Sequence, residues 1–365
     1  MNFSFHIVDL QKKVPLRISR GLKSNSRNLF LNIKNEGFSA WGESAPGKSE
    51  NAKSPEIVKK QLKNFISTGV NKSSIYELQQ RSLEMKIAPC AYAAFDMALW
   101  DLKAQKANLP LYKYLGLPKP FVPTSITIGI SSLKEIKDKM DTILNGNRFK
   151  SLKIKLGNPL GIDADKEMFS EIHKISKKFD IKLRVDANGG WGVNETIEMM
   201  NWLQKREVDY IEQPLAEGRE DDLKYVFKNR KLPIYLDESC RYANQISLWS
   251  KYVDGVNLKL MKCGGITEGL KILSTAKLHG LKTMIGCMSE SSVAIAASAS
   301  ISGIIDFVDL TQVHVCRGVV RLEFKGFECC CKSLIELPEI FVYLTQVQVG
   351  IGVVRLEIKN FLCCM

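Results

Sequence analysis

Hydrophobic and polar positions follow different patterns in successive parts of the chain. Residues 28–44 (NLFLNIKNEGFSAWGES) alternate between apolar and polar on either side of an Asn-Glu-Gly turn, which predicts a β-hairpin. From Ser54-Pro55, a common helix start, the apolar residues recur at helical spacing. Residues 88–116 are rich in Ala, Leu and Met and predict a helix buried between two layers. We therefore expect an α+β domain over residues 1–120.

Beyond residue 120, short β-branched runs alternate with helical stretches. The eight runs span 124–130, 151–157, 182–188, 210–214, 234–239, 255–261, 281–287 and 306–311. Strands that alternate with helices form parallel sheets, and eight of them can close into a barrel. An open doubly wound sheet would carry a Gly-rich phosphate turn after its first strand, and this sequence has none there. The predicted fold class is α/β: a modified TIM-type (β/α)7β barrel over residues 121–310 with an α+β N-terminal capping domain.

The last segment, residues 311–365, follows neither pattern. Residues 310–331 recur as 344–365 with 15 of 22 positions identical, and two copies are too few for a solenoid. The near identity favours a tail fused by duplication, a changed reading frame or a misassigned gene end over divergence of a native C-terminal segment.

The cysteines support the separate origin of this tail. Six of the ten cysteines lie in the last 56 residues, among them the clusters Cys329-Cys330-Cys331 and Cys363-Cys364. These clusters lack the CxxC spacing and paired histidines of a soft-metal site, so we predict none.

Composition and charge narrow the class of protein. A chain of 365 residues that is 45% hydrophobic is not wholly disordered. No apolar stretch reaches about 18 residues, and the N-terminus lacks the layout of a secretory signal. We therefore expect a cytoplasmic protein that does not bind membranes. The net charge of +13 comes from scattered lysines with no polybasic block, which indicates a solvated surface rather than a nucleic-acid site.

Three acidic residues end consecutive predicted strands: Asp186 in RVDAN, Glu212 in YIEQP and Asp237 in LDES. They lie 26 and 25 residues apart, about one strand–helix unit each. Catalytic groups of such barrels lie at the carboxyl ends of the strands. Three carboxylates at one point repel each other unless a hard divalent cation joins them, and oxygen ligands favour magnesium. Each acid alone would fit a helix cap or an ion pair, but together this acidic triad predicts a metal site.

Lysines lie on both sides of the triad. Lys153 and Lys155 are two residues apart on one predicted strand, so their side chains point the same way. Inside a barrel, mutual repulsion and a nearby metal would lower a lysine pKa and make a usable base; a solvated strand face would show the same spacing. Lys259 ends the sixth barrel strand, across from the second, and Lys262 is the better candidate for a solvated lysine there.

The motifs occur together and in a specific order: KIK at 153–155, VDANGGW at 185–191, IEQPL at 211–215, LDES at 236–239 and KLMKCGG at 259–265. In this order and spacing they resemble the enolase superfamily, specifically its muconate-lactonizing-enzyme subgroup. The resemblance runs from about residue 1 to residue 310. Within the subgroup, KLMKCGG and MIGCMSESSVAIAA are most similar to dipeptide epimerases of the L-Ala-D/L-Glu type.

The resemblance implies a role for each matching residue. The acidic triad would bind one Mg2+ per subunit, which holds the substrate carboxylate. Lys155 and Lys259 would exchange the α-proton on opposite faces, with Lys153 assisting by its charge. The implied reaction inverts an α-carbon of a dipeptide by two-base 1,1-proton transfer through an enediolate, whose charge metal and ammonium groups stabilise. Ser289 and Glu290 would contact the substrate.

Other implied positions support or border this site. Asn188 and Glu238 would lie in a second layer behind the metal ligands. Dipeptide epimerases carry Asp-x-Asp at the end of the last strand to receive the amino terminus of the substrate. Here that stretch is Asp309-Leu310-Thr311. A hydroxyl in place of a carboxylate would weaken ammonium binding by ~1–3 kcal/mol.

The sequence of the capping domain says less about substrate specificity. Arg17 and Arg20, in the loop after the first strand, each fit a contact to a distal substrate carboxylate and also fit the surface. Cycloisomerisation, o-succinylbenzoate synthesis and N-acylamino-acid racemisation stay open, since they use the same metal and lysines. An inactive homologue, caused by the altered C-terminus, is the alternative from another class. The predicted partner is a small-molecule dipeptide, with a homo-oligomer left open.

Overall fold

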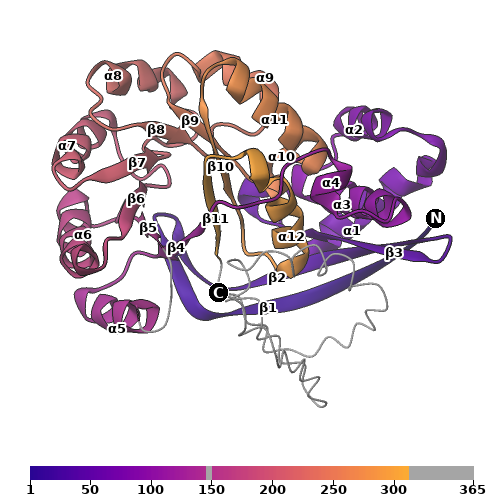
Figure 1. Ribbon diagram of the computed structural model, residues 1–365, viewed down its shortest axis with the longest axis horizontal. Helices are drawn as coiled ribbons and strands as arrows, with labels where there is room; N and C mark the ends of the chain where they lie inside the picture. Colours follow the sequence, from indigo (N-terminus) through magenta and orange to yellow (C-terminus); the bar gives the residue numbers. More distant parts are fainter. Residues whose placement is uncertain (145–149, 312–365) are drawn as a thin grey trace.

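The computed structural model describes residues 1–144 and 150–311 (Figure 1). Its N-terminal part carries an antiparallel sheet of β1 (Asn2–Ile18), β2 (Gly21–Asn35) and β3 (Phe38–Ser44). Asn35 pairs with Phe38 across the predicted hairpin. Glu36 and Gly37 have φ of 51° and 84°, the left-handed geometry that suits a tight turn between twisted strands. The expected hairpin is therefore present.

Helices cover one side of this sheet, and they are α1 (Pro55–Ser67), α2 (Ile75–Glu84), α3 (Pro89–Lys106) and α4 (Leu111–Tyr114). Ser54 caps α1 and Pro55 opens it, as expected. The helix α3 is buried along most of its length and packs on β3. A Cβ at Gly42 would lie 1.9 Å from the Ala94 carbonyl oxygen, so glycine permits this close packing.

The second part is a closed parallel barrel of eight strands, in the order β10-β11-β4-β5-β6-β7-β8-β9. The strands are β4 (Thr124–Ile128), β5 (Ser151–Lys155), β6 (Lys182–Asp186), β7 (Val208–Glu212), β8 (Ile234–Leu236), β9 (Gly255–Leu258), β10 (Lys282–Gly286) and β11 (Phe307–Thr311). Seven of the eight predicted runs contain one of these strands, and the run at 210–214 overlaps β7, which begins two residues earlier, at Val208. The (β/α)7β barrel with its capping domain is thus confirmed.

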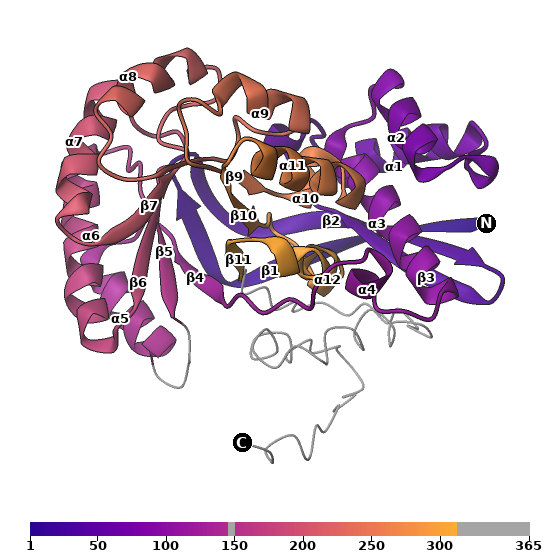
Figure 2. The ribbon, with the colours of Figure 1, turned by 45° about the horizontal axis from the view of Figure 1, so that its top comes forward.

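Helices connect the strands and surround the barrel (Figures 1 and 2). They are α5 (Leu133–Leu144), α6 (Ile162–Ser176), α7 (Val193–Gln204), α8 (Leu223–Lys228), α9 (Ala243–Trp249), α10 (Leu260–Cys263), α11 (Ile266–Leu278) and α12 (Ser292–Ser300). Single 3-10 turns occur at η1 (Lys48–Glu50), η2 (Val70–Lys72), η3 (Lys177–Phe179), η4 (Glu220–Asp222) and η5 (Ser302–Ile304). In the part of the chain described, no helix is both long and apolar enough to cross a membrane.

The barrel interior is filled by side chains that lie before the carboxyl ends of its strands. Tyr210, Tyr235 and Met284 form a separate buried cluster, against which Phe307 packs. The guanidinium of Arg184 lies 4.9 Å from the ring centre of Phe307. This filling leaves the carboxyl ends of the strands as the place for a site.

The hairpin of β1 and β2 reaches from the cap helices to the barrel strands (Figure 1). Its turn is fixed to the barrel, because Ile130 N donates to Arg17 O at 2.8 Å and Ser19 Oγ donates to Asn188 O at 3.0 Å. Arg17 belongs to β1 itself, not to the loop that we expected. The Cys329–Cys331 and Cys363–Cys364 clusters, the repeat and the side chain of Thr311 lie outside the described residues.

Candidate active site

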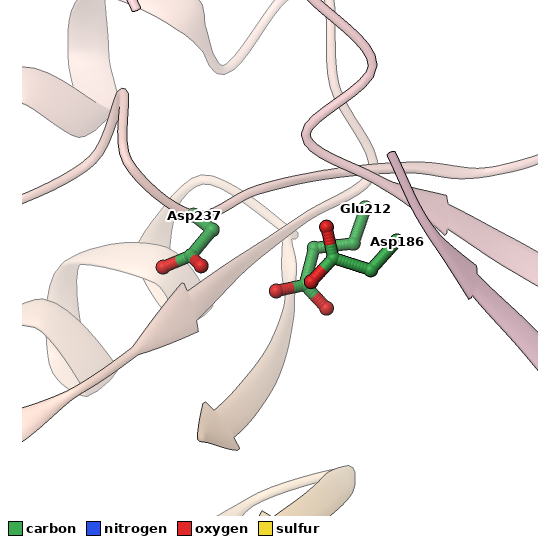
Figure 3. Close-up of side chains that lie close together, drawn as sticks. All are labelled: Asp186, Glu212 and Asp237. Carbon is green, nitrogen blue, oxygen red and sulfur yellow. The ribbon is translucent and has the colours of Figure 1, made fainter. Parts of the chain in front are cut away.

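The three acids of the triad meet at the carboxyl end of the barrel. Asp186 and Glu212 are the last residues of β6 and β7, and Asp237 follows β8 directly. One carboxylate oxygen from each lies within 4.8 Å of the others, and all three side chains are buried. Figure 3 shows Asp186 and Glu212 side by side with Asp237 facing them. Spacing of one strand–helix unit therefore brings these residues together as expected.

Lys153 lies beneath the triad and is 1% exposed. Its ammonium is 2.6 Å from Glu212 Oε2, 2.9 Å from Asp309 Oδ2 and 3.4 Å from Asp186 Oδ2. Three carboxylates therefore share one buried positive charge, which makes Lys153 the centre of the local charge balance.

Lys155 and Lys259 approach the triad from opposite sides. Lys155 Nζ donates to Asp186 Oδ2 at 2.5 Å, and Lys259 Nζ donates to Asp237 Oδ2 at 2.5 Å. Lys155 ends β5 and Lys259 follows β9, and four steps around the eight-stranded barrel separate these strands. Both side chains are buried. The arrangement places an ammonium group on each side of the acids.

The acids control the protonation of their neighbours. Burial lowers the pKa of Lys153, but Asp309, Glu212 and Asp186 outweigh burial and hold it well above its ordinary value. For Lys259 burial also opposes the charged form, yet Asp237 and Glu238 raise the pKa. The carboxylates alone therefore raise the pKa of Lys153, and the lowering expected beside a bound metal stays a prediction.

The carboxylates are affected unequally. Burial disfavours ionisation of Asp186, but Lys155 and Lys153 overcome it and lower its pKa to about 2. Burial and the neighbouring Asp186 raise the pKa of Glu212 to about 8. A cation among these oxygens would supply the charge that keeps Glu212 ionised, and three buried carboxylates form the hard oxygen donor set that Mg2+ prefers. The residues present thus fit Mg2+.

Lys262 is not the solvated lysine that we expected, because it is 1% exposed. Its ammonium donates to Asp237 Oδ1 at 2.9 Å, to Asn257 O at 2.8 Å and to the Asp237 carbonyl oxygen. Sequence reasoning also missed Asn257, whose Nδ2 donates to Glu212 Oε1 at 2.7 Å. The two-residue spacing between Asn257, in β9, and Lys259, directly after β9, was a usable signal for a shared face.

The residues expected in a second layer lie against the triad. Asn188 donates from its backbone N to Asp186 Oδ1 at 2.8 Å, and its φ of 46° lets the chain turn back there. Glu238 adjoins Asp237 in sequence, and its Oε1 lies 2.5 Å from Nη2 of Arg20. Arg20 Nη1 also donates to Asn188 O at 3.2 Å. Arg20 therefore contacts the barrel rim.

Of the other residues expected to contact the substrate, some lie by the triad and others do not. Asp309 lies by the triad, where Ser125 Oγ donates to its Oδ1 at 2.9 Å and Lys153 neutralises it. Glu290 is buried, accepts from Met288 N at 2.7 Å and has its pKa raised to about 8 by burial. Ser289 accepts at its carbonyl oxygen from Asn28 Nδ2 at 2.7 Å. The side chain of Arg17 is exposed on β1 and is not brought to the triad.

A cavity of about 540 Å3 lies where the cap turn meets the barrel rim. Ser19 and Arg20 line it from the cap, and the loops after β5, β6, β7 and β8 complete it. Its wall includes Asn188 and Glu238, which adjoin the metal-site residues, whereas the triad itself does not line it. The cavity is therefore next to the acids and beneath the cap turn.

Comparison with known proteins agrees with this geometry. The chain matches the family described as "Mandelate racemase / muconate lactonizing enzyme, N-terminal domain" over residues 3–116 and "Enolase C-terminal domain-like" over residues 135–325. It is 58% identical over 310 residues to a hydrophobic dipeptide epimerase of a Flavobacteria bacterium (strain MS024-2A), covering 85% of this chain and 89% of that protein.

Two further relatives extend the comparison. A hydrophobic dipeptide epimerase of Roseobacter litoralis is 48% identical, covering 85% of this chain and 90% of its own length. The crystal structure of a dipeptide epimerase from Enterococcus faecalis, complexed with Mg and the dipeptide L-Leu-L-Tyr, superposes with a TM-score of 0.79 at 33% identity, covering 84% and 89% of the two chains. This chain therefore belongs to the mandelate racemase/muconate lactonizing enzyme family of the enolase superfamily.

Proposed function

We propose that the protein is a magnesium-dependent dipeptide epimerase. One observation carries the proposal: Lys155 and Lys259 lie on opposite sides of three buried carboxylates, each 2.5 Å from one of them. Inversion at a carbon needs one group to remove a proton and another to return a proton to the opposite face. The family and the names of the relatives support the same reaction.

The roles of the residues follow from their positions. Asp186, Glu212 and Asp237 would hold Mg2+, which when bound stabilises the negative charge that develops on the substrate carboxylate. In one direction Lys155 takes the α-proton while Lys259 donates one from the other face, and in the reverse direction these roles exchange. Lys153 adds fixed positive charge beneath the acids, which further favours the enediolate.

For the substrate we propose a dipeptide without an acidic side chain. Arg20 is paired with Glu238, so its charge is already compensated. The relatives at 58% and 48% identity are named hydrophobic dipeptide epimerases. The other reactions of the subgroup are not favoured, since these relatives act on dipeptides by name.

The test is α-proton exchange in deuterated water with Mg2+. We expect deuterium to enter one α-carbon of hydrophobic dipeptides with inversion, faster than for L-Ala-L-Glu. Lys155→Ala and Lys259→Ala should each stop exchange on a different face. A folded protein that exchanges no proton across a broad dipeptide library would refute the activity. Exchange on both faces in either variant would refute the assignment of the two bases.

Two further proposals come from the sequence. They are the location in the cytoplasm and the homo-oligomer expected in the sequence analysis. Fractionation of cells and light scattering of the purified protein test these two proposals independently of the reaction.

A further inference from the structure

Lys262 is a buried charge to which the proposed reaction gives no task. Its side chain is 1% exposed, and no proton-transfer role follows from its position. Taking an ammonium group out of water costs several kcal/mol unless it is paired and hydrogen-bonded. A lysine kept at this depth therefore has to be balanced by its contacts.

The contacts of Lys262 use all of its hydrogen-bonding capacity. An ammonium group has three protons, and here they go to Asp237 Oδ1 at 2.9 Å, to Asn257 O at 2.8 Å and to the Asp237 carbonyl oxygen. None of the three is left for a substrate. Lys262 is therefore bound to the protein itself.

These acceptors belong to two neighbouring strand ends. Asp237 follows β8, and Asn257 lies in β9 two residues before Lys259. Lys262 sits in the short helix α10, for which Lys259 is the N-cap residue. A single ammonium group thus joins the end of β8, the end of β9 and the turn that carries Lys259.

Asp237 lies between two lysines, each of which donates to a different oxygen of its carboxylate. Its Oδ1 accepts from Lys262, and its Oδ2 accepts from Lys259 at 2.5 Å. Because one oxygen and the adjacent carbonyl are fixed by Lys262, rotation of the carboxylate would break hydrogen bonds in a buried place. The second oxygen is thereby kept facing Lys259 and the other acids of the triad.

We propose that Lys262 is a positioning residue that fixes Asp237 for metal binding and, through Asp237, places the ammonium group of Lys259. The first part of this proposal, that Lys262 fixes Asp237 for metal binding, requires only that the acidic triad binds Mg2+. The half that concerns Lys259 rests on the proposed function, since it concerns proton transfer on one face.

The first measurement is the affinity for Mg2+ without substrate, by titration calorimetry. Lys262→Met removes the ammonium group and keeps most of the side-chain volume. We expect Mg2+ to bind at least tenfold more weakly, because partners that orient a ligand typically contribute 10–100-fold to metal affinity. Unchanged or tighter binding would overturn the proposal, since the loss of a positive charge alone favours cation binding.

The matched control is Lys282→Met. Lys282 begins β10 at the far end of the strand, its side chain is 64% exposed, and its ammonium pairs with Asp306. This change removes the same charge from the protein without touching the triad. We expect unchanged Mg2+ affinity, so an equally large weakening would show that the effect is not specific to the contacts of Lys262 and would contradict positioning.

The second measurement separates the two faces. Loss of α-deuterium from each epimer is followed in Lys262→Met, with Lys155→Ala and Lys259→Ala defining the faces. We expect exchange on the face of Lys259 to fall at least tenfold more than exchange on the face of Lys155. Equal losses would overturn the placement of Lys259. Absence of exchange in the unchanged protein would refute the proposed function, while the Mg2+ titration would still test the first half.

A variant that does not fold would give no comparison, so thermal unfolding is checked first. If Lys262→Met is unfolded, Lys262→Gln provides the same two measurements, because its amide retains two N–H donors without the charge. We expect Lys262→Gln to lie between the unchanged protein and the effect predicted for Lys262→Met. Wild-type values for Lys262→Gln in both measurements would overturn the proposal.

Discussion

Lys153 concentrates more opposing charge than any other lysine discussed above. Its ammonium lies within 3.4 Å of carboxylate oxygens from Glu212, Asp309 and Asp186, in a place that is 1% exposed. Removing one partner of a buried ion pair leaves an uncompensated charge in the interior and strongly lowers the free energy of unfolding. Replacing both partners by apolar residues often has little effect. The stability of the barrel mouth should therefore depend on this one side chain.

Lys153→Met tests that dependence. We expect the free energy of unfolding without metal to fall by about 3–5 kcal/mol, because three carboxylates lose the charge that they share. Urea unfolding followed by circular dichroism measures the loss. Adding Asp309→Asn should recover part of it, since one negative charge is then removed as well. A loss below about 1 kcal/mol, similar to that of an exposed ion pair, would contradict the argument.

The residues of the site were predictable to different degrees. The triad could be found because strand ends recur at the spacing of one strand–helix unit, so Asp186, Glu212 and Asp237 carry a positional signal. Lys262 carries none, because burial depends on how the short helix α10 turns back into the barrel. The contact of Arg20 with Glu238 joins positions 218 residues apart and has no local pattern at all.

At the scale of elements, the middle of cap helix α3 is joined to the first turn of barrel helix α11. Asp96, in the middle of α3, accepts from Thr267 N at 3.0 Å and from Thr267 Oγ1 at 2.5 Å. These groups belong to the first turn of α11, whose N-cap residue is Gly265 and offers no side chain for capping. A carboxylate from another domain thus satisfies the free backbone donor there.

Titration of Asp96 gives a prediction with a definite sign. Burial raises its pKa to about 6, against about 3.9 in an unfolded chain. The folded state therefore binds the proton more tightly, and this contribution to stability is complete below pH 4 and lost as the pH rises through 6. Relative to Asp96→Asn, the natural protein should lose on the order of 2–3 kcal/mol of unfolding free energy between pH 4 and pH 7.

Urea unfolding of both proteins across this pH range measures the difference. Asp163→Asn is the matched control, since Asp163 lies in the first turn of α6 with a side chain that is 95% exposed. This control should follow the natural protein at every pH. A constant gap between Asp96→Asn and the natural protein would show that Asp96 titrates alike in both states and would contradict the prediction.

Element boundaries were predictable where a local rule applied. The Ser54-Pro55 start of α1 and the turn of Glu36 and Gly37 follow from short-range chemistry. The length of β1 did not, because Pro15 and the charged residues around it interrupt the alternation that marks a strand. Pairing of Leu16 and Arg17 with β2 overrides that weak propensity, which places Arg17 in the strand.

At the scale of the whole molecule, the cap turn is fastened to loops that carry the site. Arg20 Nη2 lies 2.5 Å from Glu238, and its Nη1 donates to Asn188 O. Asn188 in turn holds Asp186, and Glu238 adjoins Asp237. A Cβ at Gly157 would lie 3.3 Å from the Ser19 side chain and 2.4 Å from Ala187 O, so this approach is closely fitted. The position of the cap turn and the geometry of the triad are therefore coupled through these contacts.

Arg20→Gln should release the cap turn without unfolding the cap. We expect amide hydrogen exchange of the backbone around Ser19 and Gly21 to become at least tenfold faster, because fewer contacts oppose local opening. Arg27→Gln is the control, since Arg27 pairs with Asp9 and Glu56 inside the cap and does not reach the barrel. It should leave exchange at the turn unchanged.

The effect of Arg20→Gln on catalysis distinguishes fastening from substrate binding. If Arg20 acts by holding the cap turn over the cavity, kcat/KM should fall about tenfold or more for every dipeptide, regardless of side-chain charge, since an open turn admits water and loosens the substrate. If the guanidinium instead binds a substrate carboxylate, only acidic dipeptides should lose activity and the hydrogen exchange of the turn should be unchanged. Measuring kcat/KM for neutral and acidic dipeptides together with the hydrogen-exchange rates decides between these two roles. A guanidinium that is paired with Glu238 to hold the turn is not free to bind a substrate carboxylate.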